Sequence, residues 1–64
     1  MKYTRRGRYL DSEDGKWTIC KDYVTGAYTL LNKETHEYIK EKDGIIIRQW
    51  GYLRDVKNYI DNWA

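Results

Sequence analysis

Closely spaced turn signals divide most of this chain into short segments, and they limit its fold more than any other feature. Gly15 closes an acidic turn, Thr25-Gly26 marks a second break, and Asp43-Gly44 is a strong tight-turn dipeptide. Turns at such intervals, with no proline between them, are typical of antiparallel hairpins. The strands expected between these turns cover residues 3–10, 16–24, 27–31, 37–41 and 45–50.

The segment 32–37 is predicted to form a further hairpin loop, with an unusual residue at its critical position. A loop of this kind needs a left-handed backbone where His36 stands, and glycine usually occupies that place. Histidine tolerates the left-handed region better than a β-branched residue does. We therefore expect His36 to adopt a positive φ angle.

The spacing of apolar residues changes near residue 51, from a period of two to a helical period of about three and a half. An amphipathic helix over residues 52–63 is therefore predicted, with polar residues on its opposite face. At some three turns it would be marginal alone, so it must be stabilised by docking on the sheet. The apolar stripe consists of Leu53, Val56, Ile60 and Trp63, widened by Tyr52 and Tyr59.

These segments predict an α+β fold, an antiparallel β-meander of four or five strands with one C-terminal amphipathic α-helix. Residues 1–64 form one small domain, in which residues 9–50 make the hairpins and residues 1–8 make either a basic arm or an edge strand. The alternative is a sheet that curls into a small SH3-like barrel. A chain this short buries only about 60% of its unfolded surface, so apolar groups are hard to hide.

Groups that could carry out catalysis or hold a metal are scarce. Cys20 and His36 are the only residues of their types, so no third residue is marked to orient a nucleophile and base, and no structural zinc site can form. The acidic turn 11–14 lacks the alternating oxygen ligands of a calcium loop, and no glycine-rich phosphate loop is present. We therefore expect a non-enzymatic protein without cofactor or metal.

The positive charge is concentrated at the amino end of a chain whose net charge is only +2. Guanidinium groups interleaved with tyrosines can neutralise phosphates while the rings stack on bases. This pattern indicates, as an alternative function, a small DNA- or RNA-binding domain. The simpler interpretation is an edge strand that its charges keep soluble. The residues concerned are Lys2, Arg5, Arg6 and Arg8.

The aromatic residues exceed what so small a core can hide, and all of them carry a polar group. Seven tyrosines and three tryptophans accompany no phenylalanine, a composition suited to half-wet recognition surfaces. The run 45–47 would place isoleucines on both faces of a strand, and one helix cannot cover both faces. Either the sheet curls into a barrel, or an apolar patch remains for a partner or for self-association. The expected protein-binding surface is Tyr28, Tyr38, Ile46 and Trp50.

One part of the chain resembles a known family of DNA-binding domains. Strands followed by one helix, with Gly15-Lys16-Trp17 opening a strand, resemble the three-strand-plus-helix domains of the AP2 and integrase-arm type. The resemblance covers residues 15–28 and the helix, and implies a sheet packed against that helix. The hairpin 32–49 departs from the family pattern, so no DNA-contacting residues are carried over.

The abundance of Lys, Asn, Ile, Tyr and Asp resembles that of small phage proteins from low-GC bacteria. Such proteins often bind and block a host machine, and anti-CRISPR inhibitors are examples. The resemblance implies a phage or mobile-element protein that binds a larger protein or a protein–nucleic-acid complex and modulates or inhibits it. A free thiol, no apolar stretch in the first ten residues and no run of about 18 apolar residues predict a cytoplasmic protein without membrane contact.

Overall fold

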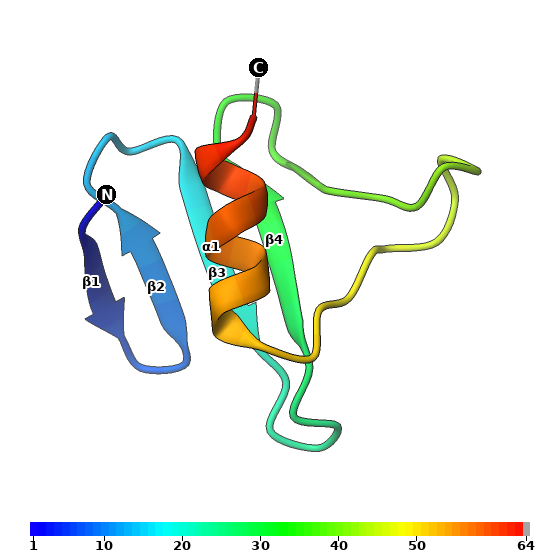
Figure 1. The fold of residues 1–64 in the computed structure, drawn as a ribbon, viewed down its shortest axis with the longest axis horizontal. Coiled ribbons are helices and arrows are strands. Elements are labelled where there is room, and N and C mark those ends of the chain that lie inside the picture. The colour runs from blue at the N-terminus through cyan, green and yellow to red at the C-terminus, as the bar shows by residue number, and fades with distance from the viewer. Residues whose placement is uncertain (64) are drawn as a thin grey trace.

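The computed structural model describes residues 1–63 and shows a five-stranded antiparallel sheet followed by one helix (Figure 1). Each strand pairs with its neighbour in sequence, so the predicted meander with a C-terminal helix is confirmed. Strands β1 and β5 are both open edges, so the sheet does not close into the alternative SH3-like barrel. The elements are β1 (Tyr3–Arg6), β2 (Tyr9–Ser12), β3 (Trp17–Lys21), β4 (Tyr28–Asn32), β5 (Glu37–Tyr38) and α1 (Leu53–Asp61).

The loop between β4 and β5 has the conformation that its sequence predicts. His36 has a φ of 60°, and it is the only residue other than glycine with a positive φ among residues 1–63. Its N–H donates to the carbonyl of Asn32 at 2.8 Å. The Asn32 side chain accepts the N–H of Glu34 at 2.9 Å, which satisfies a second loop donor. The prediction of a left-handed histidine is therefore confirmed.

The predicted strand 3–10 is wrong, because the chain reverses within it. Gly7 has a φ of 63°, and Arg6 pairs directly with Tyr9 across this turn. A glycine lacks the Cβ atom that disfavours positive φ, so it permits a tight reversal that other residues resist. Residues 1–8 consequently contain the edge strand β1 and part of a hairpin turn.

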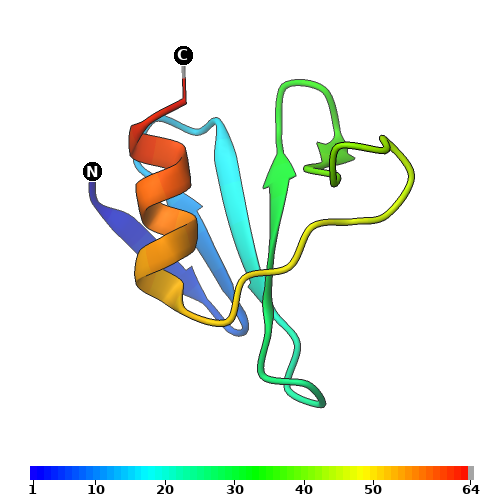
Figure 2. The same cartoon turned by 45° about the vertical axis from the view of Figure 1, so that its right-hand side comes forward.

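The predicted strand 45–50 is also wrong, and the expected strand 37–41 ends at Tyr38. Only two isolated bridges remain in this region, Lys40 with Ile47 and Tyr28 with Trp50. Residues 39–49 form a projection that leaves the sheet beyond β5 and returns before α1 (Figures 1 and 2). We call this projection the isoleucine arm, since residues 45–47 are all isoleucine.

The core lies between α1 and one face of the sheet (Figure 2). Val56 and Ile60 are the buried residues of the helix, and Leu30 of β4 is fully enclosed beneath it. Tyr52, expected to widen the helical stripe, lies outside α1 and is largely exposed. Trp63, expected on the stripe, also lies outside α1, but its ring packs against Trp17 of the core with 5.3 Å between centroids. The buried core is Trp17, Ile19, Leu30, Trp50, Val56 and Ile60.

Candidate functional site

The backbone of the isoleucine arm is held by regular hydrogen bonds, although it forms no strand. The N–H of Arg48 donates to the carbonyl of Ile39 at 2.9 Å, and the N–H of Glu41 donates to that of Ile46 at 2.7 Å. Ile39 is itself tied to β4, because its N–H donates to the Leu30 carbonyl at 2.9 Å. The arm is therefore an ordered extension of the sheet.

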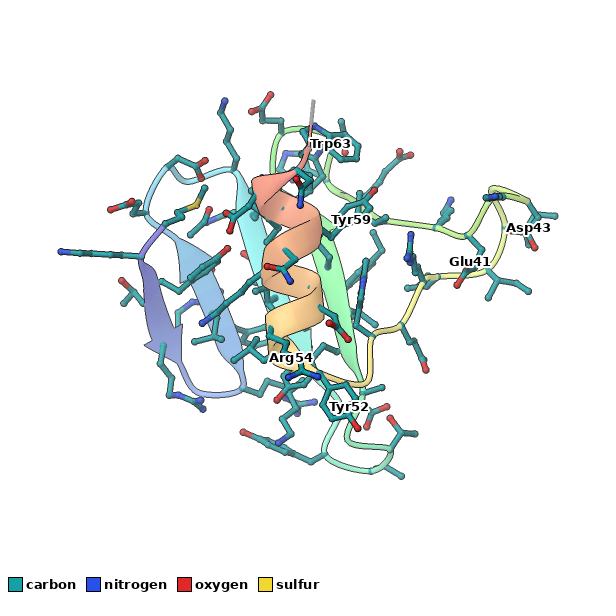
Figure 3. The ribbon with its side chains drawn as sticks, viewed as in Figure 1. Glu41, Asp43, Tyr52, Arg54, Tyr59 and Trp63 are labelled. Carbon is teal, nitrogen blue, oxygen red and sulfur yellow. The ribbon has the colours of Figure 1, made fainter. Side chains whose placement is uncertain are left out.

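The tip of the arm is organised by one carboxylate. Asp43 accepts the backbone N–H of Ile45 at 2.8 Å and that of Ile46 at 3.1 Å. These two N–H groups stabilise the charged form, so they lower the pKa of the Asp43 carboxyl from its ordinary value. Gly44 takes the positive φ that the turn needs, at 72°. Figure 3 shows Glu41 and Asp43 at the outer end of the arm, far from the helix.

Large apolar side chains cover the outer part of this arm. Ile45, Ile46 and Ile47 are 78%, 60% and 41% exposed, and Tyr38 at the base is 39% exposed. These exposed side chains make the arm a candidate interaction surface, since large apolar patches on small proteins are often functional. The sequence predicted Ile46 and Tyr38 for such a surface. It missed Ile45 and Ile47, because strand alternation assigned them to the opposite face from Ile46.

The other two residues predicted for the protein-binding surface lie at the inner end of the arm. Trp50 is only 7% exposed and belongs to the core, and Tyr28 is half-buried beside it. Their backbones exchange two hydrogen bonds of 2.8 and 2.9 Å. Trp50 also packs against Tyr59 of α1, with 5.3 Å between ring centroids. These residues anchor the arm to the domain and do not present its surface.

The four basic residues predicted to bind nucleic acid do not form one surface. Arg6 turns away from the helix and bonds to Asp11, with 3.0 Å between Nε and Oδ2. Lys2 lies at the far end of the β1–β2 pair, where its N–H donates to Glu13 at 3.3 Å. Arg5 and Arg8 line a pocket on the helix side of the sheet. The pairing with Asp11 thus removes Arg6 from any continuous basic footprint.

The residues considered for catalysis lie at opposite ends of the sheet. Cys20 pairs with Thr29, while His36 follows the other end of β4 in the β4–β5 loop. The Cys20 thiol has a backbone carbonyl, that of Lys21, as its contact at 3.9 Å. Within residues 1–63, no three Asp, Glu, His or Cys side chains gather where they could hold a metal ion. The structure therefore keeps Cys20 and His36 apart.

Comparison of the chain with protein-family models, curated proteins and solved structures gave no match. Of the residues that the structure describes, no helix has the length and apolar character needed to cross a membrane. The function must therefore be argued from the geometry of the arm and of the charged surfaces.

Proposed function

We propose that this protein is a non-enzymatic binding module that docks its isoleucine arm on a larger protein or protein–nucleic-acid complex. The observation that carries the proposal is the exposure of three consecutive isoleucines at the end of an ordered arm. Burying one such side chain is worth about 1.5–3 kcal/mol, so three of them supply a substantial driving force for association.

The order of the arm strengthens the case for binding. Association loses free energy when loops and side chains must be ordered at the interface, and a preformed loop reduces that loss. The bonds from Asp43 to the N–H groups of Ile45 and Ile46 hold the tip in one conformation before any partner arrives. The partner that fits this surface is a protein with an apolar groove, in which the isoleucines act as central anchors.

The composition of the chain supports a biological setting for this activity. Its resemblance to small phage proteins favours a phage or mobile-element protein that modulates or inhibits a host protein complex, as anti-CRISPR proteins do. The same proposal places the protein in the cytoplasm, where a free Cys20 thiol stays reduced. Self-association through the arm is the competing hypothesis, and the mass of the pure protein in solution distinguishes it from binding to a host partner.

The proposal is tested by replacing one isoleucine and comparing the variant with a matched control. Ile46→Ser removes an anchor from the arm, while Val24→Ser removes another β-branched apolar side chain from the β3–β4 loop, where Val24 is 94% exposed. Immobilised protein is incubated with host lysate, retained proteins are identified by mass spectrometry, and the affinity of each is then measured by calorimetry. We expect Ile46→Ser to weaken binding about tenfold or more, as loss of a central interface residue does.

Two results would overturn the proposal. One is a retained protein that binds wild type, Ile46→Ser and Val24→Ser equally, and the other is the absence of any specifically retained protein. Size-exclusion chromatography with light scattering is run in parallel on the pure protein. A dimer that Ile46→Ser dissociates would show that the arm serves self-association instead of a host partner.

The alternative prediction, a nucleic-acid-binding domain led by all four amino-terminal basic residues, receives less support. Arg6 is paired with Asp11 on the opposite face of the sheet from Arg5. A phosphate-binding surface depends on clustered cations on one face. Only Arg5 and Arg8 of the four satisfy that condition, because both line the same pocket.

A further inference from the structure

A small pocket lies on the helix side of the sheet, separate from the isoleucine arm. It has a volume of about 80 Å³. The β1–β2 turn, the β3–β4 loop and the start of α1 all lie at this end of the molecule (Figure 1). Figure 3 shows Tyr52 and Arg54 marking the start of the helix there. The lining residues are Arg5, Arg8, Leu10, Ile19, Lys21, Tyr23, Tyr28 and Leu53.

The strand register explains why cations gather in this pocket. Arg8, the residue before β2, lies opposite Lys21, the last residue of β3, since the N–H of Lys21 donates to the Arg8 carbonyl at 3.2 Å. Lys21 in turn pairs with Tyr28 of β4. Arg5 lies in a neighbouring row of the same face, opposite Leu10. Two rows of the sheet therefore bring three positive side chains to one apolar floor.

The positive charge in the pocket is not balanced by carboxylates. Among residues 1–63, no ion pair involves Arg5, Arg8 or Lys21, and no acidic side chain lines the pocket. The Arg5 guanidinium has one backbone acceptor, the Gly7 carbonyl at 3.4 Å. The nearby carboxylate of Asp22 accepts the N–H of Val24 at 2.8 Å and belongs to the β3–β4 turn.

In a second hollow, at the other end of the molecule, the cation is paired with a carboxylate. This hollow has a volume of about 370 Å³, and there Lys16 faces Glu34 with 3.9 Å between Nζ and Oε1. Arg8, in the turn just before β2, lies opposite Lys21 at the end of β3, and like charges placed opposite each other are destabilising. An anion bound between Arg8 and Lys21 would remove that repulsion. The second hollow needs no such anion, because Glu34 already neutralises Lys16.

Two tyrosines of the pocket lining contact its cations. The Lys21 ammonium lies over the rings of Tyr23 and Tyr28, at 5.9 and 5.7 Å from their centroids. The Arg8 guanidinium lies over the Tyr23 ring at 5.9 Å. Leu53, the first residue of α1, lines the pocket, and no side chain caps this helix end. The positive end of the helix dipole lies there, and Asp55 is the acidic residue in the first turn of the same helix.

We propose that this pocket binds a backbone phosphate of single-stranded nucleic acid. Its volume is well below the roughly 300 Å³ of pockets that enclose whole small molecules, so it accepts one anionic group while the rest of the ligand stays outside. Tyr23, which is 64% exposed at the rim, offers a ring on which an unpaired base can stack. A duplex would not present an unstacked base to this ring. The site is independent of the isoleucine arm and of its partner.

Binding is tested with a fluorescently labelled oligothymidylate, by anisotropy at low salt and at several salt concentrations. Arg8→Gln and Lys21→Gln each remove one pocket charge, and Lys42→Gln removes the same charge from the tip of the arm. We expect about a tenfold loss of affinity for each pocket variant and less than about a twofold loss for the control. A plot of log K against log salt has a negative slope, and its magnitude should decrease by about 0.7 for each phosphate that the variant no longer neutralises.

The role of Tyr23 is tested by a pair of substitutions. Tyr23→Leu removes the ring and should weaken binding roughly fivefold or more without changing the salt slope, while Tyr23→Phe keeps the ring and should restore the affinity. Both Tyr23 and Arg8 are exposed, so their variants should fold, and circular dichroism verifies this for every variant.

Three outcomes would contradict the proposal. The first is equal weakening by Lys42→Gln and the pocket variants, which would indicate only a general charge effect. The second is no salt-dependent binding of the oligonucleotide by the wild-type protein. The third is saturable binding of inorganic phosphate without oligonucleotide binding, which would identify a free anion as the ligand. None of these results bears on the isoleucine arm, so the two proposals fail independently.

Discussion

Asp11 illustrates how a single residue links neighbouring elements on the sheet face opposite α1. Its carboxylate accepts hydrogen bonds from Arg6 of β1 at 3.0 Å and from the hydroxyl of Thr18 of β3 at 2.8 Å. Lys33 approaches the same carboxylate at 3.9 Å. The Arg6 bond, followed by the Thr18 bond, holds the pKa of Asp11 below its ordinary value of 3.8.

Replacing Asp11 should therefore weaken the sheet. Thr18 is only 4% exposed, and Asp11→Ala would leave its hydroxyl without this acceptor. We expect a loss of about 1–3 kcal/mol in the free energy of unfolding, the usual effect of an unsatisfied buried polar group. Urea denaturation at neutral pH measures it. The double variant Asp11→Ala, Thr18→Val should recover part of the loss, and a loss confined to the double variant would contradict this explanation.

The lowered pKa also predicts an acid dependence with a defined sign. Because the folded-state pKa of Asp11 lies below 3.8, its contribution to stability is complete above that pH and is lost as the pH falls through the folded-state pKa. Asp14 and Asp43 have lowered pKa values and act in the same direction. Urea denaturation below pH 3.8 should show a shallower loss for Asp11→Asn than for wild type. An unchanged slope would exclude Asp11 from the acid response.

At the scale of the elements, the β4–β5 hairpin depends on the left-handed conformation of His36, whose φ is 60°. A residue with a Cβ atom loses about 1–2 kcal/mol in this region, whereas glycine does not. Glycine also has more conformational freedom in the unfolded chain, and this offsets about 0.5–1 kcal/mol of the stability gained by placing glycine at the left-handed position.

We therefore expect His36→Gly to raise the free energy of unfolding by about 0.5 kcal/mol. His36→Val should lower it, because a β-branched residue fits this region poorly. Chemical denaturation of the two variants beside wild type gives the comparison. The same stability for His36→Gly and His36→Val would show that the loop adopts another conformation in the variants and does not require a positive φ at position 36.

At the scale of the whole molecule, stability depends on one layer of contacts between α1 and the sheet. A domain of this length has a free energy of unfolding of roughly 3–10 kcal/mol. Leu30 is 0% exposed beneath the helix, while its neighbour Leu31 is half-buried on the opposite face. Consecutive strand residues thus have very different environments.

Leu30→Ala should cost about 2–5 kcal/mol, which is comparable with the whole stability of the domain. We expect circular dichroism and urea denaturation to show a partly or wholly unfolded variant. Leu31→Ala removes the same atoms from the open face and should leave the protein folded, with a clearly smaller loss. Equal losses for Leu30→Ala and Leu31→Ala would mean that the helix does not define the main core.

The correct and incorrect sequence predictions differ in the range of the interactions involved. The turn at Gly15, the left-handed His36 and the helical stripe were predictable because neighbouring residues decide them. The reversal at Gly7 was missed, since the segment 3–10 also satisfies a continuous strand. The strand expected at 45–50 does not form, and Asp43 accepts the N–H groups of Ile45 and Ile46, which removes these two donors from strand pairing.

The residues of the candidate surfaces also differ in whether the sequence could identify them. Ile46 and Tyr38 were identified from the surplus of large side chains, and the structure leaves both exposed. Trp50 was assigned to the same surface, yet it packs under the arm against Tyr59. The basic pocket was not predictable from the chain, because Lys21 joins Arg5 and Arg8 only through strand pairing.

Residue order alone was enough to specify the meander and the terminal helix. Turn chemistry and apolar period are local properties, so they need no knowledge of distant contacts. Which large side chains are enclosed, and which cations share a pocket, became clear only from the folded molecule. Both outcomes depend on strand register and on the face that α1 covers, and these are set by packing between segments far apart in the chain.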